Sequence, residues 1–336
     1  MIMKQNAIRY ALTFFLMLAA LSGGHLYAGE GQFSASYLYT LSNFTGVYPI
    51  SWAKIDVDPA KDDIYVVSLT KIKVFNENGM EIYTFNETGE LGWVKDMAVH
   101  SSGDILVVAF RPQEGRNVIS RCDFRGEQVS TIELKGLPDE YKDFTPNRVV
   151  IRNDTLYLAN TEAVQVIVAD MSGEFQKVYD IAAIIQKDIE KEYAGDNVQK
   201  EREQKREQLD AGMTGFTVDG QGNILFTNSA LARVYQVSPE GTLRSFGKRG
   251  SSPGKFGVPG GVIADASGKY LLVADTLRCV VLVFDRDFKF VTEFGVRGYK
   301  PGNLVGPMYM AVDGKNRVYI SQLRNRGVNV YQIAGS

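Results

Sequence analysis

The glycine-rich stretch GSSPGKF, residues 250–256, has the residue types of a phosphate-binding loop, whose chemistry would be nucleotide binding. Such a loop requires four residues between its glycines and a Ser or Thr after its Lys, whose hydroxyl holds Mg²⁺. Here Gly250 and Gly254 enclose three residues, and Phe256 follows Lys255. The spacing therefore argues against a nucleotide site.

Histidine, the residue most used in acid–base and zinc chemistry, occurs twice, as His25 and His100. His25 falls in a leader-like segment, and one remaining histidine cannot build a multi-histidine zinc site. No Ser-His-Asp set is recognisable, and no C-x-x-C-H motif for covalent haem is present. Calcium stays open, because carboxylates and carbonyls suffice to bind it.

Three charged residues, Lys54, Asp96 and Arg148, stand at matching places of a repeated pattern, with Trp52 and Trp93 close by in the sequence. Charged groups next to aromatic rings suit a polar or charged ligand. The alternative is that the three charges pair with one another and fill the space between them. The elements that position them decide between the two interpretations.

The repeated pattern consists of short β-branched-rich runs separated by polar turns, as in GVIAD, YLLVAD and CVVLVF within 261–284. Such runs predict strands, and no helical period is present in them. The pattern recurs in six units, most of them of the length expected of a propeller blade. The first runs of the six units end at Asp58, His100, Arg152, Asp219, Asp265 and Asp313.

We predict an all-β fold, a six-bladed β-propeller with four-stranded blades. A four-stranded unit cannot bury both faces alone, so neighbouring blades must stack around a ring. The last unit has three strands after residue 306, so ASYLYTL, residues 35–41, is expected to close the ring as the outer strand of blade six. Closure protects a sheet edge that would otherwise be open.

The spacers FGKRGSSPGKFGVPGGVIAD (246–265) and FGVRGYKPGNLVGPMYMAVD (294–313), with the strands around them, resemble NHL-repeat β-propellers. Blades four to six match well, and blades one to three keep only the strand pattern. The resemblance implies that inner strands line a central tunnel and that each inner strand opens on glycine. The residues at that place here are Lys54, Asp96, Arg148, Gly215, Gly261 and Tyr309. We expect a ligand or partner to contact Lys54, Asp96, Arg148, Tyr309, Trp52 and Trp93, opposite a glycine-lined wall.

The resemblance also places two sets of loops on one face around the tunnel mouth, and both carry arginines. Some cytoplasmic NHL domains bind RNA on such a face. Export, which the first residues of the chain indicate (below), argues against RNA, and the net charge of -2 argues against a general polyanion binder. We therefore expect an acidic protein, a polysaccharide or a small anion as the partner. The alternative is that these arginines are structural and pair with nearby acids. The expected basic site residues are Arg233, Arg249, Arg278, Arg297 and Arg324.

Propeller lactonases hold calcium in the tunnel with Glu, Asn and Asp, which keeps a calcium-dependent hydrolase or lyase as an alternative function. In this chain the second strands end in a partly Asn/Asp ring. Short Asn and Asp side chains commonly bond turn backbone, so we favour a structural role for this ring. Its members are Ser68, Ala109, Asn160, Asn228, Asp275 and Gln322.

Residues 181–212, IAAIIQKDIEKEYAGDNVQKEREQKREQLDAG, interrupt the repeat between blades three and four. Glu, Lys, Gln and Arg are good helix formers, and Ile181, Ile184, Ile185 and Ile189 form one apolar stripe. We predict a charged helical insert. It is either a lid or docking helix beside the binding face, or a tolerated surface insertion.

Residues 1–28 combine Lys4 and Arg9, an apolar segment and a small residue at Ala28, which is the pattern of a secretory signal peptide. An uncleaved anchor is the alternative, and no later segment has spanning length. Cys122 and Cys279 fall in distant repeats, so we expect both to be free, buried residues.

The function we predict is that of an exported, monomeric binding scaffold comprising residues 29–336, periplasmic or extracellular. It would engage a protein or an envelope polymer, not nucleic acid, through the tunnel face, without a required cofactor. The prediction follows from the repeat architecture and from the missing catalytic set.

Overall fold

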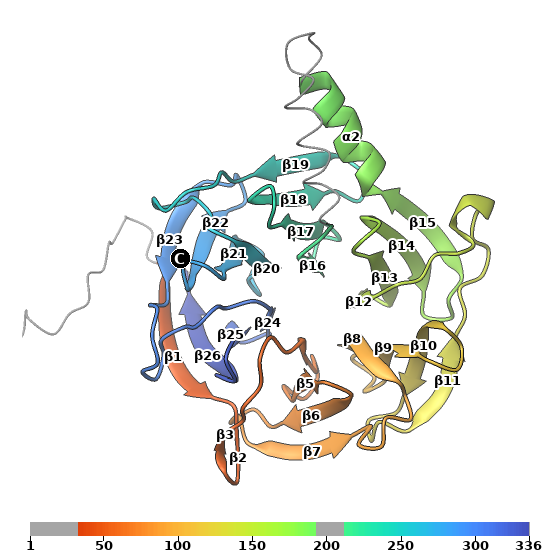
Figure 1. Cartoon of the computed structure of the whole chain (residues 1–336), viewed down its shortest axis with the longest axis horizontal. Coiled ribbons are helices and arrows are strands. Elements are labelled where there is room, and N and C mark those ends of the chain that lie inside the picture. Colours follow the sequence, from red (N-terminus) through yellow and green to blue (C-terminus); the bar gives the residue numbers. More distant parts are fainter. Residues whose placement is uncertain (1–32, 193–211, 336) are drawn as a thin grey trace, which may run out of the picture. The chain divides into compact units, whose positions relative to one another are not determined.

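The computed structural model describes residues 33–192 and 212–335, and it confirms the predicted fold class. Six sheets of four antiparallel strands form a ring (Figure 1). The predicted signal segment, residues 1–28, lies outside the described residues, as does 193–211 of the insert. Among the described residues, no helix is long and apolar enough to cross a membrane.

Blades 1 to 3 each run in chain order from an inner strand to an outer one. The 3₁₀ turn η1 (Asp139–Tyr141) lies between blades 2 and 3. Blade 1 holds β4 (Ile55–Val57), β5 (Ile64–Ser68), β6 (Lys71–Phe75) and β7 (Glu81–Phe85); blade 2 holds β8 (Trp93–Val99), β9 (Ile105–Arg111), β10 (Arg116–Cys122) and β11 (Gln128–Ile132); blade 3 holds β12 (Arg148–Arg152), β13 (Thr155–Asn160), β14 (Gln165–Asp170) and β15 (Phe175–Asp180).

Blades 4 and 5 repeat this order, and blade 6 takes its outer strand from the start of the described chain. A two-stranded hairpin, β2 (Ser42–Asn43) and β3 (Gly46–Val47), follows that strand. Blade 4 holds β16 (Gly215–Val218), β17 (Ile224–Asn228), β18 (Arg233–Val237) and β19 (Leu243–Phe246); blade 5 holds β20 (Pro259–Ala264), β21 (Tyr270–Asp275), β22 (Val280–Asp285) and β23 (Phe290–Phe294); blade 6 holds β24 (Met310–Val312), β25 (Arg317–Ser321), β26 (Val328–Ala334) and β1 (Ser34–Thr40).

The predicted ring closure is confirmed, because β1 pairs antiparallel with β26. Ser34 lies opposite Ala334 and Thr40 opposite Asn329, so the strand covers the whole length of β26. Beyond β1, the backbone N–H of Trp52 donates to the carbonyl of Gln322 at 2.8 Å, which joins blade 1 to blade 6. The edge of blade 6 is thereby paired instead of open.

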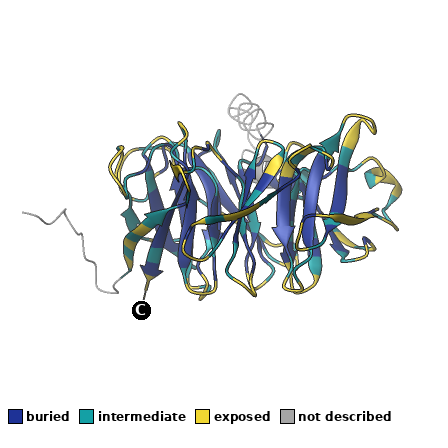
Figure 2. Cartoon of the chain, turned by 90° about the horizontal axis from the view of Figure 1, so that it is seen from below, coloured by how far each residue is buried: buried dark blue, intermediate teal, exposed yellow. Residues whose placement is uncertain are grey.

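The hydrophobic core lies between the blades, as radial stacking requires. The described residues form six clusters of buried apolar side chains, and each cluster takes side chains from two neighbouring blades. Figure 2 shows the strands buried and the exposed residues concentrated in the loops of the two faces. Each fully buried Val, Leu, Ile or Phe contributes roughly 1.5–3 kcal/mol, so the inter-blade contacts supply much of the stability of the ring.

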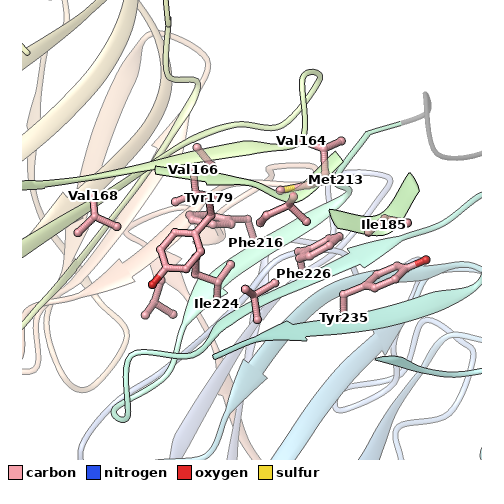
Figure 3. Packing of buried hydrophobic residues seen from close by; sticks show 14 residues of the cluster. Val164, Val166, Val168, Tyr179, Ile185, Met213, Phe216, Ile224, Phe226 and Tyr235 are labelled. Carbon is pink, nitrogen blue, oxygen red and sulfur yellow. The ribbon is translucent and has the colours of Figure 1, made fainter. Parts of the chain in front are cut away.

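The first part of the insert is a helix, α2 (Ile181–Glu192), which projects outward from the rim of the ring in Figure 1. Ile181 and Ile185 are buried in the cluster between blades 3 and 4, which also contains Val164 and Tyr179 and is shown in Figure 3. Ile184 is half-buried, and the side chain of Ile189 lies outside the described set. The apolar stripe therefore anchors the start of the insert.

Both cysteines are free and buried, as predicted. Cys122 packs in the cluster between blades 1 and 2, and Cys279 packs in the cluster between blades 5 and 6. Burial raises the pKa of the Cys122 thiol to about 12, so this residue behaves as a small apolar side chain.

Candidate binding site at the tunnel mouth

The inner strands surround a tunnel. Neighbouring inner strands contact each other around the ring, from β4 through β24 and back to β4. A cavity of about 220 Å³, the inner cavity, is lined by residues of all six inner strands, among them Ile55, Met97, Val149, Phe216, Ile263 and Met310. A second cavity of about 190 Å³ lies at one end, and we call it the mouth cavity. It is lined by Lys54, Lys95, Asn147, Arg148, Thr161, Met213, Thr214 and Tyr309.

Three of the residues expected to form a ring meet in the mouth cavity: Lys54, Arg148 and Tyr309. The ammonium of Lys54 lies 3.3 Å from the centroid of the Tyr309 ring, and the guanidinium carbon of Arg148 lies 5.3 Å from it. A cation over the face of an aromatic ring is attracted by the negative charge of that face. The aromatic ring of Tyr309 thus holds the side chains of Lys54 and Arg148 close together.

The fourth expected residue, Asp96, lies beneath these cations and lines the inner cavity. Its Oδ2 atom is 2.9 Å from Arg148 Nε and accepts the backbone N–H of Val149 at 3.0 Å. The Nε–H of Arg148 is not aligned as a hydrogen-bond donor, so the contact is an ion pair. The alternative that the three charged residues pair with one another is therefore partly correct, since Asp96 pairs with Arg148. The ion pair involves only the Nε side of the Arg148 guanidinium.

Burial dominates the electrostatics of the site. It raises the pKa of the Asp96 carboxyl well above its usual range, and the nearby Asp56 carboxylate adds to that rise. Burial also raises the pKa of Asp56 itself and lowers the pKa of Arg148. Charged groups removed from water interact strongly with any ion that enters.

Asp56, Lys95 and Arg152 belong to the tunnel but were missing from the predicted site. Asp56 Oδ2 accepts the N–H of Val99 at 2.7 Å, and Arg152 Nε donates to the carbonyl of Val218 at 2.8 Å. Alternate residues of a strand share a face. If Lys54 and Arg148 face the tunnel, Asp56 and Arg152 are expected to face it as well. That period could have identified both residues from the sequence.

The glycines of the ring do not form the open wall that the sequence suggested. A Cβ at Gly215 would lie 2.5 Å from the carbonyl oxygen of Gly260, and one at Gly261 would lie 2.5 Å from that of Met308. Glycine is required here because the inner strands of neighbouring blades approach too closely for a side chain. These positions serve the packing between blades, not the lining of a ligand site.

The two tryptophans differ in their roles. Trp52 adopts a φ of 49°, and its indole N–H donates to the carbonyl of Gly306 at 2.9 Å, so it joins blade 1 to blade 6. Trp93, the first residue of β8, is 58% exposed and contacts the Phe110 ring at 5.8 Å between centroids. Trp93 therefore presents an aromatic surface two residues before Lys95.

Most of the basic loop residues are engaged within the protein. Arg249 donates to the carbonyls of Ser229, Ala230 and Gly257, and Arg297 donates to that of Leu277. The alternative interpretation of a structural arginine is thus the better one for these two. Arg278 binds both carboxylate oxygens of Glu293, Arg233 donates to Ser245, and Arg324 donates to the Tyr299 hydroxyl.

The Asn/Asp ring at the ends of the second strands bonds turn backbone. The buried carboxylate of Asp275 accepts four backbone N–H groups, and Asn160 accepts two. His100 likewise bonds Ser102 in its own turn and Asp154 in the next blade. Within the described residues, no three His, Cys, Asp or Glu side chains are grouped so that they could hold a metal ion.

Comparison with known proteins shows a shared fold and no family. The chain matches no protein-family model and no curated protein. A protein of unknown function from Bacteroides thetaiotaomicron is 12% identical, with 90% of this chain and 77% of that one covered at a TM-score of 0.60. An auxiliary nutrient binding protein from Bacteroides ovatus is 13% identical, with 91% and 78% covered at 0.57. The virginiamycin B lyase of Staphylococcus aureus is 13% identical, with 90% and 99% covered at 0.54. The chain is thus a six-bladed β-propeller similar in fold to these proteins, and its resemblance to NHL repeats stays a prediction.

Proposed function

We propose that the chain is an exported, monomeric β-propeller that binds a protein or an envelope polymer at the mouth cavity and does not transform it. The observation that carries the proposal is the convergence of Lys54, Lys95 and Arg148 on one cavity, although the chain as a whole has a net charge of -2. A concave site with a few convergent polar groups is the usual form of a binding site.

Catalysis has less support from the residues described. One of the similar structures is a virginiamycin B lyase variant in which a histidine-to-alanine change leaves the enzyme catalytically inactive. In this chain, His100 is engaged at a turn with Ser102 and Asp154, so no histidine chemistry is proposed at the tunnel. The calcium-dependent hydrolase or lyase stays an alternative prediction, to be tested by metal analysis.

Affinity capture from the native envelope fraction tests the proposal, with the exported chain as bait and captured components identified by mass spectrometry. The site variant is Lys54→Gln/Lys95→Gln, which removes charge from the cavity without touching the Asp96–Arg148 pair. The matched control is Lys269→Gln, an exposed lysine in the turn between β20 and β21 at the opposite face. Capture lost only in the site variant supports the proposal, and equal capture by all three baits refutes it.

A further inference from the structure

The mouth cavity has an excess of uncompensated positive charge. Within the described residues, neither Lys54 nor Lys95 has an ion-pair partner, and Asp96 is the carboxylate paired with Arg148. Three cations against one carboxylate leave a local surplus that a bound anion would neutralise. Because the site is partly removed from water, that attraction is screened less than at an open surface.

The guanidinium of Arg148 supplies the geometry that selects among anions. Asp96 contacts only the Nε side, and no hydrogen bond within the described residues involves the two terminal nitrogens. The side chain is only 13% exposed, so the planar group is held in place beneath the cavity. A fixed guanidinium with two free terminal nitrogens matches a carboxylate, which accepts two parallel N–H bonds.

The size of the mouth cavity restricts what can enter it. A water molecule occupies about 30 Å³ of liquid, so 190 Å³ admits one side chain together with a few waters. A folded element does not fit. The size therefore fits a single acidic group, and on the proposed function this group projects from a larger partner.

The surface beside the mouth is apolar at two exposed positions, one in blade 1 and one in blade 2. Trp93 is 58% exposed and Leu69 is 90% exposed, and both belong to the face that carries the mouth, because they lie where inner strands begin and second strands end. Leu69 opens the two-residue loop between β5 and β6 and has a φ of 60°, a conformation for which glycine is favoured. Folding gives no reason for an exposed leucine in this strained place.

Resting on the proposed function, we propose that the partner is a protein whose binding segment carries an acidic residue flanked by apolar residues. The acidic side chain enters the mouth cavity, where its carboxylate binds the terminal nitrogens of Arg148 and the ammonium of Lys54. The flanking apolar residues pack on Trp93 and Leu69. An exposed aliphatic side chain such as Leu69 suits a protein, whereas a sugar ring stacks on aromatic faces.

Selection of random heptapeptides displayed on phage against the exported chain tests the proposal, because it requires no identified partner. We expect the enriched peptides to share a Glu or Asp flanked by apolar residues. A synthetic peptide with the shared sequence should lose about tenfold or more in affinity when its acidic residue is replaced by the amide. Its affinity should fall by a similar factor for Arg148→Lys, which keeps the positive charge but cannot donate two parallel hydrogen bonds to one carboxylate. Its affinity for Lys269→Gln should be unchanged.

Several results of the peptide selection and of the affinity measurements would contradict the proposal. Enrichment of peptides without an acidic residue, no enrichment, or equal affinity for Arg148→Lys overturns the proposal. If Arg148→Lys does not melt cooperatively, Lys54→Gln/Lys95→Gln takes its place, and unchanged affinity there has the same meaning. A trimeric oligogalacturonate is the second probe: if it binds and no peptide does, the partner is a uronate polymer and the protein proposal fails. Envelope capture that still depends on Lys54 and Lys95 would then leave the proposed function standing.

Discussion

The contact between blades 5 and 6 at the tunnel mouth gives a sharp test of how the ring is joined. The N–H of Gly261 donates to the carbonyl of Met308 at 2.6 Å, and a Cβ at Gly261 would lie 2.5 Å from the same oxygen. The contact is with backbone, so no side chain can rotate away. Gly261→Ala must therefore push apart the inner strands of the two blades.

The magnitude follows from three terms. Overpacking costs about 1–3 kcal/mol, and the weakened hydrogen bond costs about 1 kcal/mol. Alanine lowers the conformational entropy of the unfolded chain, which stabilises the folded protein by about 0.4–1 kcal/mol. The net loss is about 1–3 kcal/mol in the free energy of unfolding, or a fall of roughly 2–6 °C in Tm for a domain of this size.

Gly220→Ala is the matched control, and calorimetry is the assay. A Cβ at Gly220 meets nothing within 4 Å, and blade 5 already has alanine, Ala266, at the corresponding place after its turn aspartate. We expect this control to keep or slightly raise Tm. If Gly261→Ala melts no lower than Gly220→Ala, the close contact between blades is not what requires glycine. Because Tyr309 follows Met308, Gly261→Ala should also weaken binding at the mouth.

Three further predictions concern single groups. Asp275→Ala should lower the free energy of unfolding by about 3 kcal/mol or more in urea titrations, since four backbone N–H groups, one of them in a buried bond and three in partly buried bonds, lose their acceptor, whereas Asp275→Asn should cost less. Affinity for the acidic peptide should rise as pH falls through the raised pKa of Asp96, which is faced by Asp56, Arg148 and Tyr309. Protonation there removes the negative charge beside Arg148, and fluorescence titration should show that Asp96→Asn flattens the dependence. Elemental analysis of the purified chain should find no stoichiometric calcium, and added Ca²⁺ should leave Tm unchanged; a bound ion or a raised Tm would revive the calcium-dependent alternative.

The strands and their order could be predicted because each depends on nearby sequence. β-branched runs between polar turns indicate strands whatever their neighbours are, and the missing fourth strand of blade 6 pointed to residues 35–41. The start of α2 was predictable for the same reason, since the spacing of Ile181 and Ile185 is local. Ring closure needed only a count of strands.

The roles of the site residues could be predicted less well, because they depend on contacts between blades. The sequence shows that Gly261 and Arg249 belong to a repeat. It does not show that Met308 lies against Gly261, or that the Ser229 carbonyl accepts a hydrogen bond from Arg249. A repeat position alone cannot distinguish a residue that lines a tunnel from one that holds two blades together. Lys95 was missed because it lies outside the repeat position that was compared.

The blades are joined at the tunnel in two chemically different ways, and the difference accounts for where the candidate site lies. Between blades 4, 5 and 6 the inner strands touch through backbone at Gly215 and Gly261, which leaves no side chain at these two positions. Between blades 1, 2, 3 and 4 a side chain bridges the gap instead: Asp56, Asp96 and Arg152 each bond one backbone group of the next blade.

A bridging side chain uses only part of its hydrogen-bonding capacity on the neighbouring backbone. Asp56 and Asp96 both line the inner cavity, and the Asp96 oxygen that accepts the Val149 N–H also contacts one edge of the Arg148 guanidinium. The Asp96 side chain, which joins blades 2 and 3, therefore also holds Arg148, a residue that lines the mouth cavity. A ring joined through glycine throughout would be equally closed but would lack the carboxylate that holds Arg148 at the mouth.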